Sequence, residues 1–314
     1  MTLGRVVGIC ACVVISSDAV AGQQSTTVIE RTHAAGGLAP WRRVQVRTES
    51  GSRELVVDTF EMPDVEGRLA PTQQSVEETN RPAPNTAHTR RELFWFAPDG
   101  RRTLTEATDS LQEPLANGGS RVVHETSVPD LNGRLTVTSR QIDETRFDPG
   151  RVRYDSTQLV RDLNGRWLPI EVHRGDTRIL AAERLEEATI QRHDVNGTLA
   201  VVERRDTRSS SANGRDRVVI EIQTPYADGS SPWALSERVH LTTTATADGG
   251  RHTIEEVESR NRANPSDPLR VIRRTVTTVR RAGSGRWVTE RQVFELDVNG
   301  RFVLVDTEEE DRQD

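Results

Sequence analysis

The chain has 314 residues, a formal net charge of −6 and only 34% hydrophobic residues, against 29% charged residues. All 42 basic residues are Arg and are interleaved with acidic residues, so the basic patch or stripe of a nucleic-acid-binding protein is absent. Such a low apolar content is typical of disordered chains, but here polar and apolar residues recur with a period, which disordered chains lack. We therefore expect a folded protein with much solvated sheet and no nucleic-acid partner.

Residues 1–21 have the pattern of a secretory signal peptide. Arg5 supplies a positive start, an apolar run extends from Val6 to Ile15, and Ala19-Val-Ala21 has the small-x-small form of a cleavage site. The run is shorter than the about 20 apolar residues of a membrane span. We expect export to the periplasm or the cell exterior.

The only cysteines, Cys10 and Cys12, lie inside this leader, so a bacterial lipoprotein anchor stays open as an alternative. Residues 22–39 show no pattern, and we interpret them as a linker between the leader and the folded domain.

From residue 40 onward, turns recur at a nearly fixed spacing. Successive differences of 33, 33, 32, 32 and 32 residues separate the turn glycines Gly67, Gly100, Gly133, Gly165, Gly197 and Gly229. A second set of turns lies about midway between them. A fixed period of a few tens of residues indicates a repeated supersecondary unit. Each unit has room for two strands, which predicts tandem antiparallel β-hairpins.

Four of the main turns share the sequence Asp-x-Asn-Gly. Gly accepts positive φ, Asn tolerates it better than most residues, and the preceding Asp can accept hydrogen bonds from the turn backbone. Calcium ligation is disfavoured, because no bidentate Glu follows at the spacing of an EF-hand loop. The predicted structural turns are Asn132-Gly133, Asn164-Gly165, Asn196-Gly197 and Asn299-Gly300.

Three segments fit the hairpin register poorly. Thr72 to His88 is polar and contains Pro82 and Pro84, which cannot donate to a ladder, so it reads as a loop or a frayed tip. Thr103 to Leu115 reads as an edge strand by register. Residues 307–314 are acidic, and we expect a disordered tail there.

Apolar residues concentrate beside the main turns, while polar runs flank most of the intermediate turns. The expected fold is therefore one all-β domain over residues 40–306. Its tandem antiparallel hairpins form a curved sheet or a closed, barrel-like core with projecting tips. The apolar ends of the hairpins, beside the main turns, are buried together.

An outer-membrane barrel is disfavoured by the same residues. Such barrels show an apolar lipid-facing band and aromatic girdles at both interfaces. Here charged residues occur on both alternating faces, and there are only two tyrosines. We expect that the chain is not an integral membrane protein, and we leave an envelope or lipid partner open.

No catalytic or metal-binding motif is present. The seven histidines form no His-x-His or His-Glu-x-x-His, and Gly-x-Ser-x-Gly and phosphate-cradling glycine patterns are absent. We expect no catalytic residue, no metal and no cofactor. Any ligand pocket would be built from large aromatic residues, and the candidates are Phe94, Trp95, Phe96, Trp167 and Trp233.

The functional expectation is an exported β-repeat protein with a non-catalytic binding or envelope-structural role. Two alternatives stay open: a carrier of an apolar ligand in the repeat core, and a secreted hydrolase with a dispersed site. A cleft in which His173, His193 or His240 lies beside a buried carboxylate would favour the hydrolase.

Overall fold

The computed structural model describes residues 23–31, 41–116, 118–162, 164–193, 197–225, 233–260, 267–282, 286–297 and 299–313. Within these ranges every regular element is a β-strand, and the strands form a single sheet. They are β1 (Gln23–Arg31), β2 (Trp41–Ser50), β3 (Arg53–Pro63), β4 (Leu69–Ala83), β5 (Thr86–Phe96), β6 (Arg102–Pro114), β7 (Ser120–Pro129), β8 (Leu135–Asp148), β9 (Arg151–Arg161), β10 (Trp167–Ile179), β11 (Glu183–His193), β12 (Leu199–Ala212), β13 (Arg215–Thr224), β14 (Ala234–Ala245), β15 (Arg251–Ser259), β16 (Arg270–Arg281), β17 (Arg286–Leu296) and β18 (Phe302–Gln313).

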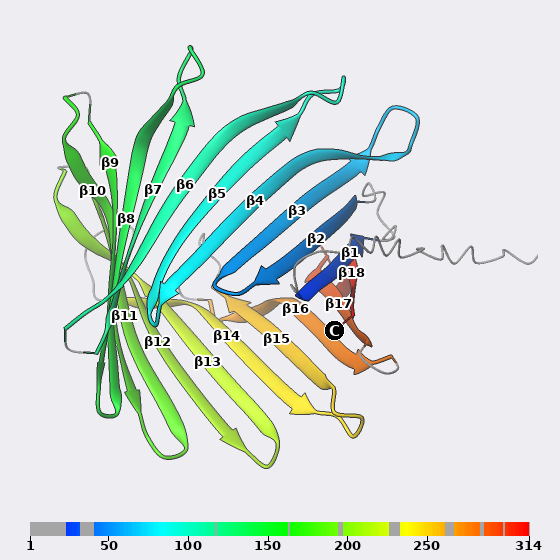
Figure 1. Ribbon diagram of the computed structural model, residues 1–314. Helices are drawn as coiled ribbons and strands as arrows, with labels where there is room; N and C mark the ends of the chain where they lie inside the picture. Colours follow the sequence, from blue (N-terminus) through cyan, green and yellow to red (C-terminus); the bar gives the residue numbers. More distant parts are fainter. Residues whose placement is uncertain are drawn as a thin grey trace, which may run out of the picture.

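The sheet is an antiparallel meander that closes on itself (Figure 1). Each strand pairs with the next in sequence, and β1 pairs with both β2 and β18. Closure removes the edge strands whose N–H and C=O groups would otherwise lack partners. The all-β hairpin fold expected from the repeat is confirmed, and of the two forms considered it is the closed barrel. The expected signal peptide, residues 1–21, lies outside the described residues.

Because every strand reverses direction, alternate turns lie at the same end of the barrel. We name the end that carries the turns after the odd-numbered strands β3 to β17 the main rim, and the other end the opposite rim. The four Asp-x-Asn-Gly sequences follow β7, β9, β11 and β17, so all belong to the main rim. Asn196 falls outside the described residues, while Gly197 has a φ of +74°.

The Asp130–Arg134 turn shows how these sequences reverse the chain. The carbonyl of Asp130 accepts from the Gly133 N–H at 2.9 Å, and the Asp130 N–H donates to the Arg134 carbonyl at 2.9 Å. The Asp130 carboxylate accepts from the backbone N–H groups of Asn132 (2.8 Å) and Arg134 (2.9 Å). Gly133 has a φ of +77°, whereas Asn132 keeps negative φ. This is a three-residue loop with a left-handed Gly, not the two-residue Asn-Gly turn.

The same carboxylate contacts recur at Asp162 and Asp297, in the turns that contain Asn164-Gly165 and Asn299-Gly300. A true two-residue Asn-Gly turn occurs at the opposite rim. There Asn213 has a φ of +53° and Gly214 a φ of +71°, between the paired residues Ala212 and Arg215.

Each hairpin closed at the main rim carries one β-bulge near that rim. The extra residue lies on the second strand and is always Thr, Ser, Ile or Val; the eight are Thr72, Thr105, Thr138, Ile170, Val202, Ser236, Ile272 and Val305. The four hydroxyl residues donate to a carbonyl across the strand pair, at 3.0–3.3 Å. Bulges increase strand twist, which a sheet needs in order to curve into a barrel.

Three expected boundaries are corrected by the strands. The expected linker, residues 22–39, contains β1, and of the expected disordered tail, residues 307–314, the described residues 307–313 form most of β18. These polar segments pair with each other, and backbone pairing needs no apolar content. The expected loop from Thr72 to His88 forms β4 and β5; its two prolines lie at the register shift and in the turn, where no ladder donor is required.

The apolar ends of the hairpins do not meet in a central core. Strands contact chiefly their neighbours in the sheet, and apolar residues near the main rim stay partly exposed, as Leu168 (46%), Phe302 (36%) and Leu304 (39%) show. The barrel is wide enough that its wall, rather than a filled interior, carries the fold. No helix of the described residues is long and apolar enough to cross a membrane.

Because the two kinds of Asn-Gly turn hold Asn at different φ, we predict that Asn→Ala lowers the free energy of unfolding by different amounts in the two. Asn213→Ala forces Ala into the left-handed region and should lower the free energy of unfolding by about 1 kcal/mol. Asn132→Ala should cost much less, because Asn132 has ordinary φ. Urea unfolding of the refolded chain measures both, and equal costs would contradict the assignment of two turn types.

The main-rim turns also predict a pH effect at Asp64. Its carboxylate accepts hydrogen bonds from the amide groups of Arg68 (2.9 Å) and Glu66 (2.8 Å), and these bonds lower the pKa of Asp64. A carboxyl with a lowered folded-state pKa stabilises the turn above its unfolded pKa, and this contribution is lost as the pH falls through the folded value.

We therefore expect hydrogen exchange at the Arg68 amide, relative to its intrinsic rate, to accelerate as Asp64 protonates. Asp64→Asn keeps an acceptor oxygen but does not titrate, so it should remove this acid-dependent step. A step that persists in Asp64→Asn would show that another group controls the turn.

Candidate functional site: the polar lumen wall

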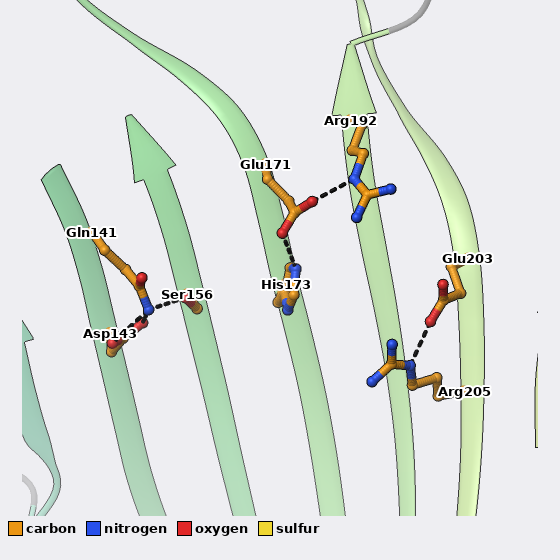
Figure 2. A network of polar contacts seen from close by, with 8 residues as sticks. All are labelled: Gln141, Asp143, Ser156, Glu171, His173, Arg192, Glu203 and Arg205. Carbon is orange, nitrogen blue, oxygen red and sulfur yellow. Dashed lines mark hydrogen bonds and ion pairs between the residues drawn. The ribbon is translucent and has the colours of Figure 1, made fainter. Parts of the chain in front are cut away.

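The two faces of the sheet can be told apart in Figure 2. With the nearer chain cut away, the view falls on the inner face of β8 to β12, from which the eight labelled side chains project. They are Gln141, Asp143, Ser156, Glu171, His173, Arg192, Glu203 and Arg205. Because side chains alternate along a strand and register partners share a face, these residues assign every paired position to the lumen or to the exterior.

One lumen cluster is built on Glu171. Its carboxylate lies 2.6 Å from His173 Nε2 and accepts a hydrogen bond from Arg192 Nε (Figure 2). Glu171 and Arg192 are register partners on β10 and β11, and His173 is the next inward residue on β10. The cluster therefore fixes one anionic and one cationic group on the wall, with an imidazole beside them.

A second lumen cluster crosses β6, β7 and β8 in a row. His124 Nδ1 lies 2.6 Å from Ser110 Oγ, and His124 Nε2 lies 3.3 Å from Asp143 Oδ2. Gln141 Nε2 donates to both Asp143 oxygens at 3.0 Å and lies 3.4 Å from Ser156 Oγ (Figure 2). The order Ser, His, Asp resembles a nucleophile relay. However, the surrounding N–H groups belong to the strand ladder, so no oxyanion hole faces the serine.

A shallow cavity of about 260 Å³ lies against this second cluster. Its lining consists of the lumen-facing polar residues Thr108, His124, Thr126, Ser139, Gln141 and Gln158, together with Arg140, whose side chain faces outward. A wall of hydroxyl, amide and imidazole groups holds water and small polar solutes well and offers little to an apolar ligand.

Tyr154 and Gly175 show how closely the lumen side chains are fitted. They are register partners on β9 and β10, and the Tyr154 hydroxyl reaches Glu186 Oε1 on β11 at 3.4 Å. A Cβ on Gly175 would lie 2.0 Å from Tyr154 Cε1. Gly175 therefore lets the ring lie flat across β10. Sequence reasoning missed this pair, because nothing in the chain marks which residue faces Gly175.

The exterior also carries charges, and many of these are paired across strands. Arg140 Nε donates to Glu125 at 2.9 Å, and Arg238 donates to Glu221 at 2.8 Å. Both pairs face outward, because Arg140 lies between two lumen residues of β8 and register partners share a face. The expectation of charges on both faces was right, but many of these charges neutralise each other in pairs.

The five aromatic residues expected around a pocket do not converge on one. Phe94, Trp95 and Phe96 end β5, Trp167 begins β10, and Trp233 directly precedes β14. Phe94 is buried, whereas Trp95 faces the lumen and is 54% exposed. They share the main rim, not a cavity.

The three histidines weighed as hydrolase candidates are used structurally. His193 places its two ring nitrogens 2.7 Å from the Gly197 carbonyl and 2.6 Å from the Pro169 carbonyl. His240 Nε2 lies 3.8 Å from Glu258, a carboxylate that also faces Arg238. His173 belongs to the Glu171 cluster. No group of three or more metal-ligating side chains occurs in the described part of the chain.

Comparison with known proteins gives one kind of match. No family model matches the chain, and no curated protein matches its sequence. A mutant porin of Rh. blastica superposes with a TM-score of 0.53 at 8% identity, over 93% of this chain and 100% of that chain. OccK3 (OpdO) of Pseudomonas aeruginosa superposes with a TM-score of 0.52 at 13% identity, over 93% of each chain. Identities this low show a shared fold, the closed antiparallel barrel.

This likeness overturns two expectations. The expectation that the chain is not an integral membrane protein is wrong, because its closed barrel is the architecture of outer-membrane porins. The expected non-catalytic binding or envelope-structural role, with its apolar-carrier and hydrolase alternatives, is also contradicted, because the chain shares the closed-barrel fold of outer-membrane porins. The composition led to the expectation of a protein outside the membrane because it shows the number of charged residues but not that many of them pair across strands.

Because the Tyr154 ring lies over Gly175, we predict that the loss of stability caused by Gly175→Ala depends on the presence of that ring. Gly175→Ala should lower the free energy of unfolding by about 1–3 kcal/mol, since the added methyl displaces the ring. In a Tyr154→Ser background the same substitution should cost little, because the methyl then has space. Chemical unfolding of the four proteins completes the cycle, and an unchanged cost without the ring would show that Gly175 serves the backbone instead.

Proposed function

We propose that the chain forms a water-filled channel across an outer membrane, for ions and small polar solutes. The observation that carries this proposal is the closed wall of 18 strands with a charged and hydrogen-bonding inner face. Barrels of 16–18 strands are wide enough to leave an aqueous channel. All the described strands belong to the wall, and the comparisons with porins support the same function.

The lumen chemistry supports selection by charge more than by shape. Groups such as Glu171 and Arg192 are held on neighbouring strands at fixed positions. Fixed charges along a pore wall favour counter-ions and oppose ions of the same sign. Close pairing moderates this effect, so the two members of a pair act against each other.

Reconstitution in planar bilayers tests the channel directly. We expect the refolded chain to give discrete conductance steps that rise in proportion to the conductivity of the salt solution, as for a water-filled pore. Incorporation of folded barrels confirmed by protease protection, without any conductance, would contradict the proposal.

The Glu171–Arg192 pair predicts opposite shifts in ion selectivity. Glu171→Gln leaves Arg192 uncompensated and should move the reversal potential under a salt gradient toward anion preference. Arg192→Gln leaves Glu171 uncompensated and should move it toward cation preference.

The outward pair Glu221–Arg238 is the matched control, because it is also an Arg–Glu pair on neighbouring strands. Glu221→Gln and Arg238→Gln should leave the reversal potential near the wild-type value. Shifts as large as those of the inner pair would place the conduction path elsewhere than the lumen.

A further inference from the structure

Within the described residues, arginine side chains cover aromatic rings at five places, and all five contacts lie near the main rim. Guanidinium carbons lie 3.7–5.1 Å from the ring centroids, in the contacts Arg102–Phe94, Arg140–Trp167, Arg161–Trp167, Arg204–Trp233 and Arg274–Phe302. Cation–π stacking at such distances contributes roughly 0.5–1 kcal/mol at exposed sites. We name these nine residues the Arg–aromatic belt.

The belt faces outward. Arg204 lies between Glu203 and Arg205, which both project into the lumen (Figure 2), so its own side chain is on the exterior. Arg161 and Trp167 are register partners on the outer face of β9 and β10. The same alternation, followed through the register from Gln141 to β5, places Phe94 outside.

The belt also encircles the barrel. Its rings stand on β5, on β10, directly before β14 and on β18, so three or four strands lie between each ring and the next. Every outward-facing aromatic ring of the described residues lies toward the main rim; the inward rings include Tyr154 and Trp95. Such a one-sided ring marks one level along the barrel axis.

Three belt arginines have no acidic partner within the described ranges. Arg140 and Arg274 are compensated by Glu125 and Glu256. By contrast Arg102 donates to the neutral Gln74 at 2.7 Å, and Arg161 and Arg204 form no ion pair there. These three guanidinium groups keep donors for an anion at the outer surface.

We infer that the Arg–aromatic belt docks the barrel against phosphate-bearing anionic lipid headgroups, which sets the main rim at a membrane interface. This inference rests on the proposed channel lying in a membrane. Aromatic rings are favoured where an apolar body meets a wet headgroup layer. A guanidinium stacked on a ring is pre-organised and matches phosphate oxygens with two parallel N–H donors. The partner is therefore an anionic phospholipid, and the uncompensated charges of Arg102, Arg161 and Arg204 select it.

The test compares two triple variants of the full chain in vesicles. The belt variant is Arg102→Gln, Arg161→Gln and Arg204→Gln. The control is Arg178→Gln, Arg208→Gln and Arg217→Gln, which removes three outward arginines of the opposite half that cover no ring in the described structure.

Both triple variants are made in a background in which Trp41, Trp95 and Trp287 are replaced by Phe, so that Trp167 and Trp233 report. The vesicles are phosphatidylcholine with a small fraction of phosphatidylglycerol, and two preparations are compared. Brominated acyl chains, which quench the fluorescence of nearby Trp, are carried by the phosphatidylcholine in one preparation and by the phosphatidylglycerol in the other. The parent and the control should show preferential quenching by phosphatidylglycerol. The belt variant should lose that preference, by about fivefold in relative association constant for each Arg removed.

The outcomes separate this inference from the channel. Equal quenching by both lipids in the parent, or equal loss in both triple variants, would overturn the belt as an anionic-lipid site while leaving conductance intact. Suppression of the preference by added inorganic phosphate, beyond the effect of chloride at equal ionic strength, would assign the belt to soluble phosphate. Absence of quenching by either lipid would place the wall outside the bilayer, and absence of conductance with the lipid preference retained would overturn only the channel.

Discussion

Closure of the sheet by β1 is the constraint on which this structure depends. β1 pairs with β18 on one side and with β2 on the other, so the ladder has no end. Only eight hydrophobic side chains of the described residues are buried, too few for a core that holds the wall by itself. Continuous backbone pairing therefore carries the fold, and each cross-strand side-chain pair adds roughly 0.2–1 kcal/mol. A barrel held in this way can afford a polar interior, which a filled core cannot.

The same reliance on backbone pairing frees both faces for charge. Inside, Glu171 and Arg192 neutralise each other across neighbouring strands, and outside Glu221 and Arg238 do the same. An Arg–carboxylate pair keeps its hydrogen bonds satisfied within the sheet and so costs less at a poorly hydrated surface than either charge alone. Composition gives the number of charged residues but not which of them pair across strands. A barrel wall whose charges are spread evenly along the sequence therefore has the same composition as a solvated sheet.

The hairpin repeat could be predicted from the chain, because turn chemistry is local. Asp130 and Gly133 act within five residues of each other, and such contacts leave a spacing that the sequence displays. The closing strand β1 could not be predicted, since its sequence has no strand pattern and it becomes a strand only by pairing with β2 and β18. The lumen site was also hidden: Ser110, His124 and Asp143 adjoin only once three strands are in register. Alternation with a period of two separates two faces but does not say which of them is concave.

The two ends of the barrel differ in their bulges and in their outward aromatic rings, and this difference gives the molecule a direction. The main rim has a bulge in each hairpin and all the outward aromatic rings of the described residues, whereas the opposite rim combines two-residue turns such as Asn213-Gly214 with three-residue loops such as the one between Thr246 and Gly250. Bulges increase twist at the same level at which rings and uncompensated arginines gather. The outer surface of the wall therefore differs in chemistry between its two ends. The Arg–aromatic belt sets the position of the main rim at the membrane interface, and the paired charges on the inner face line the polar path through the barrel.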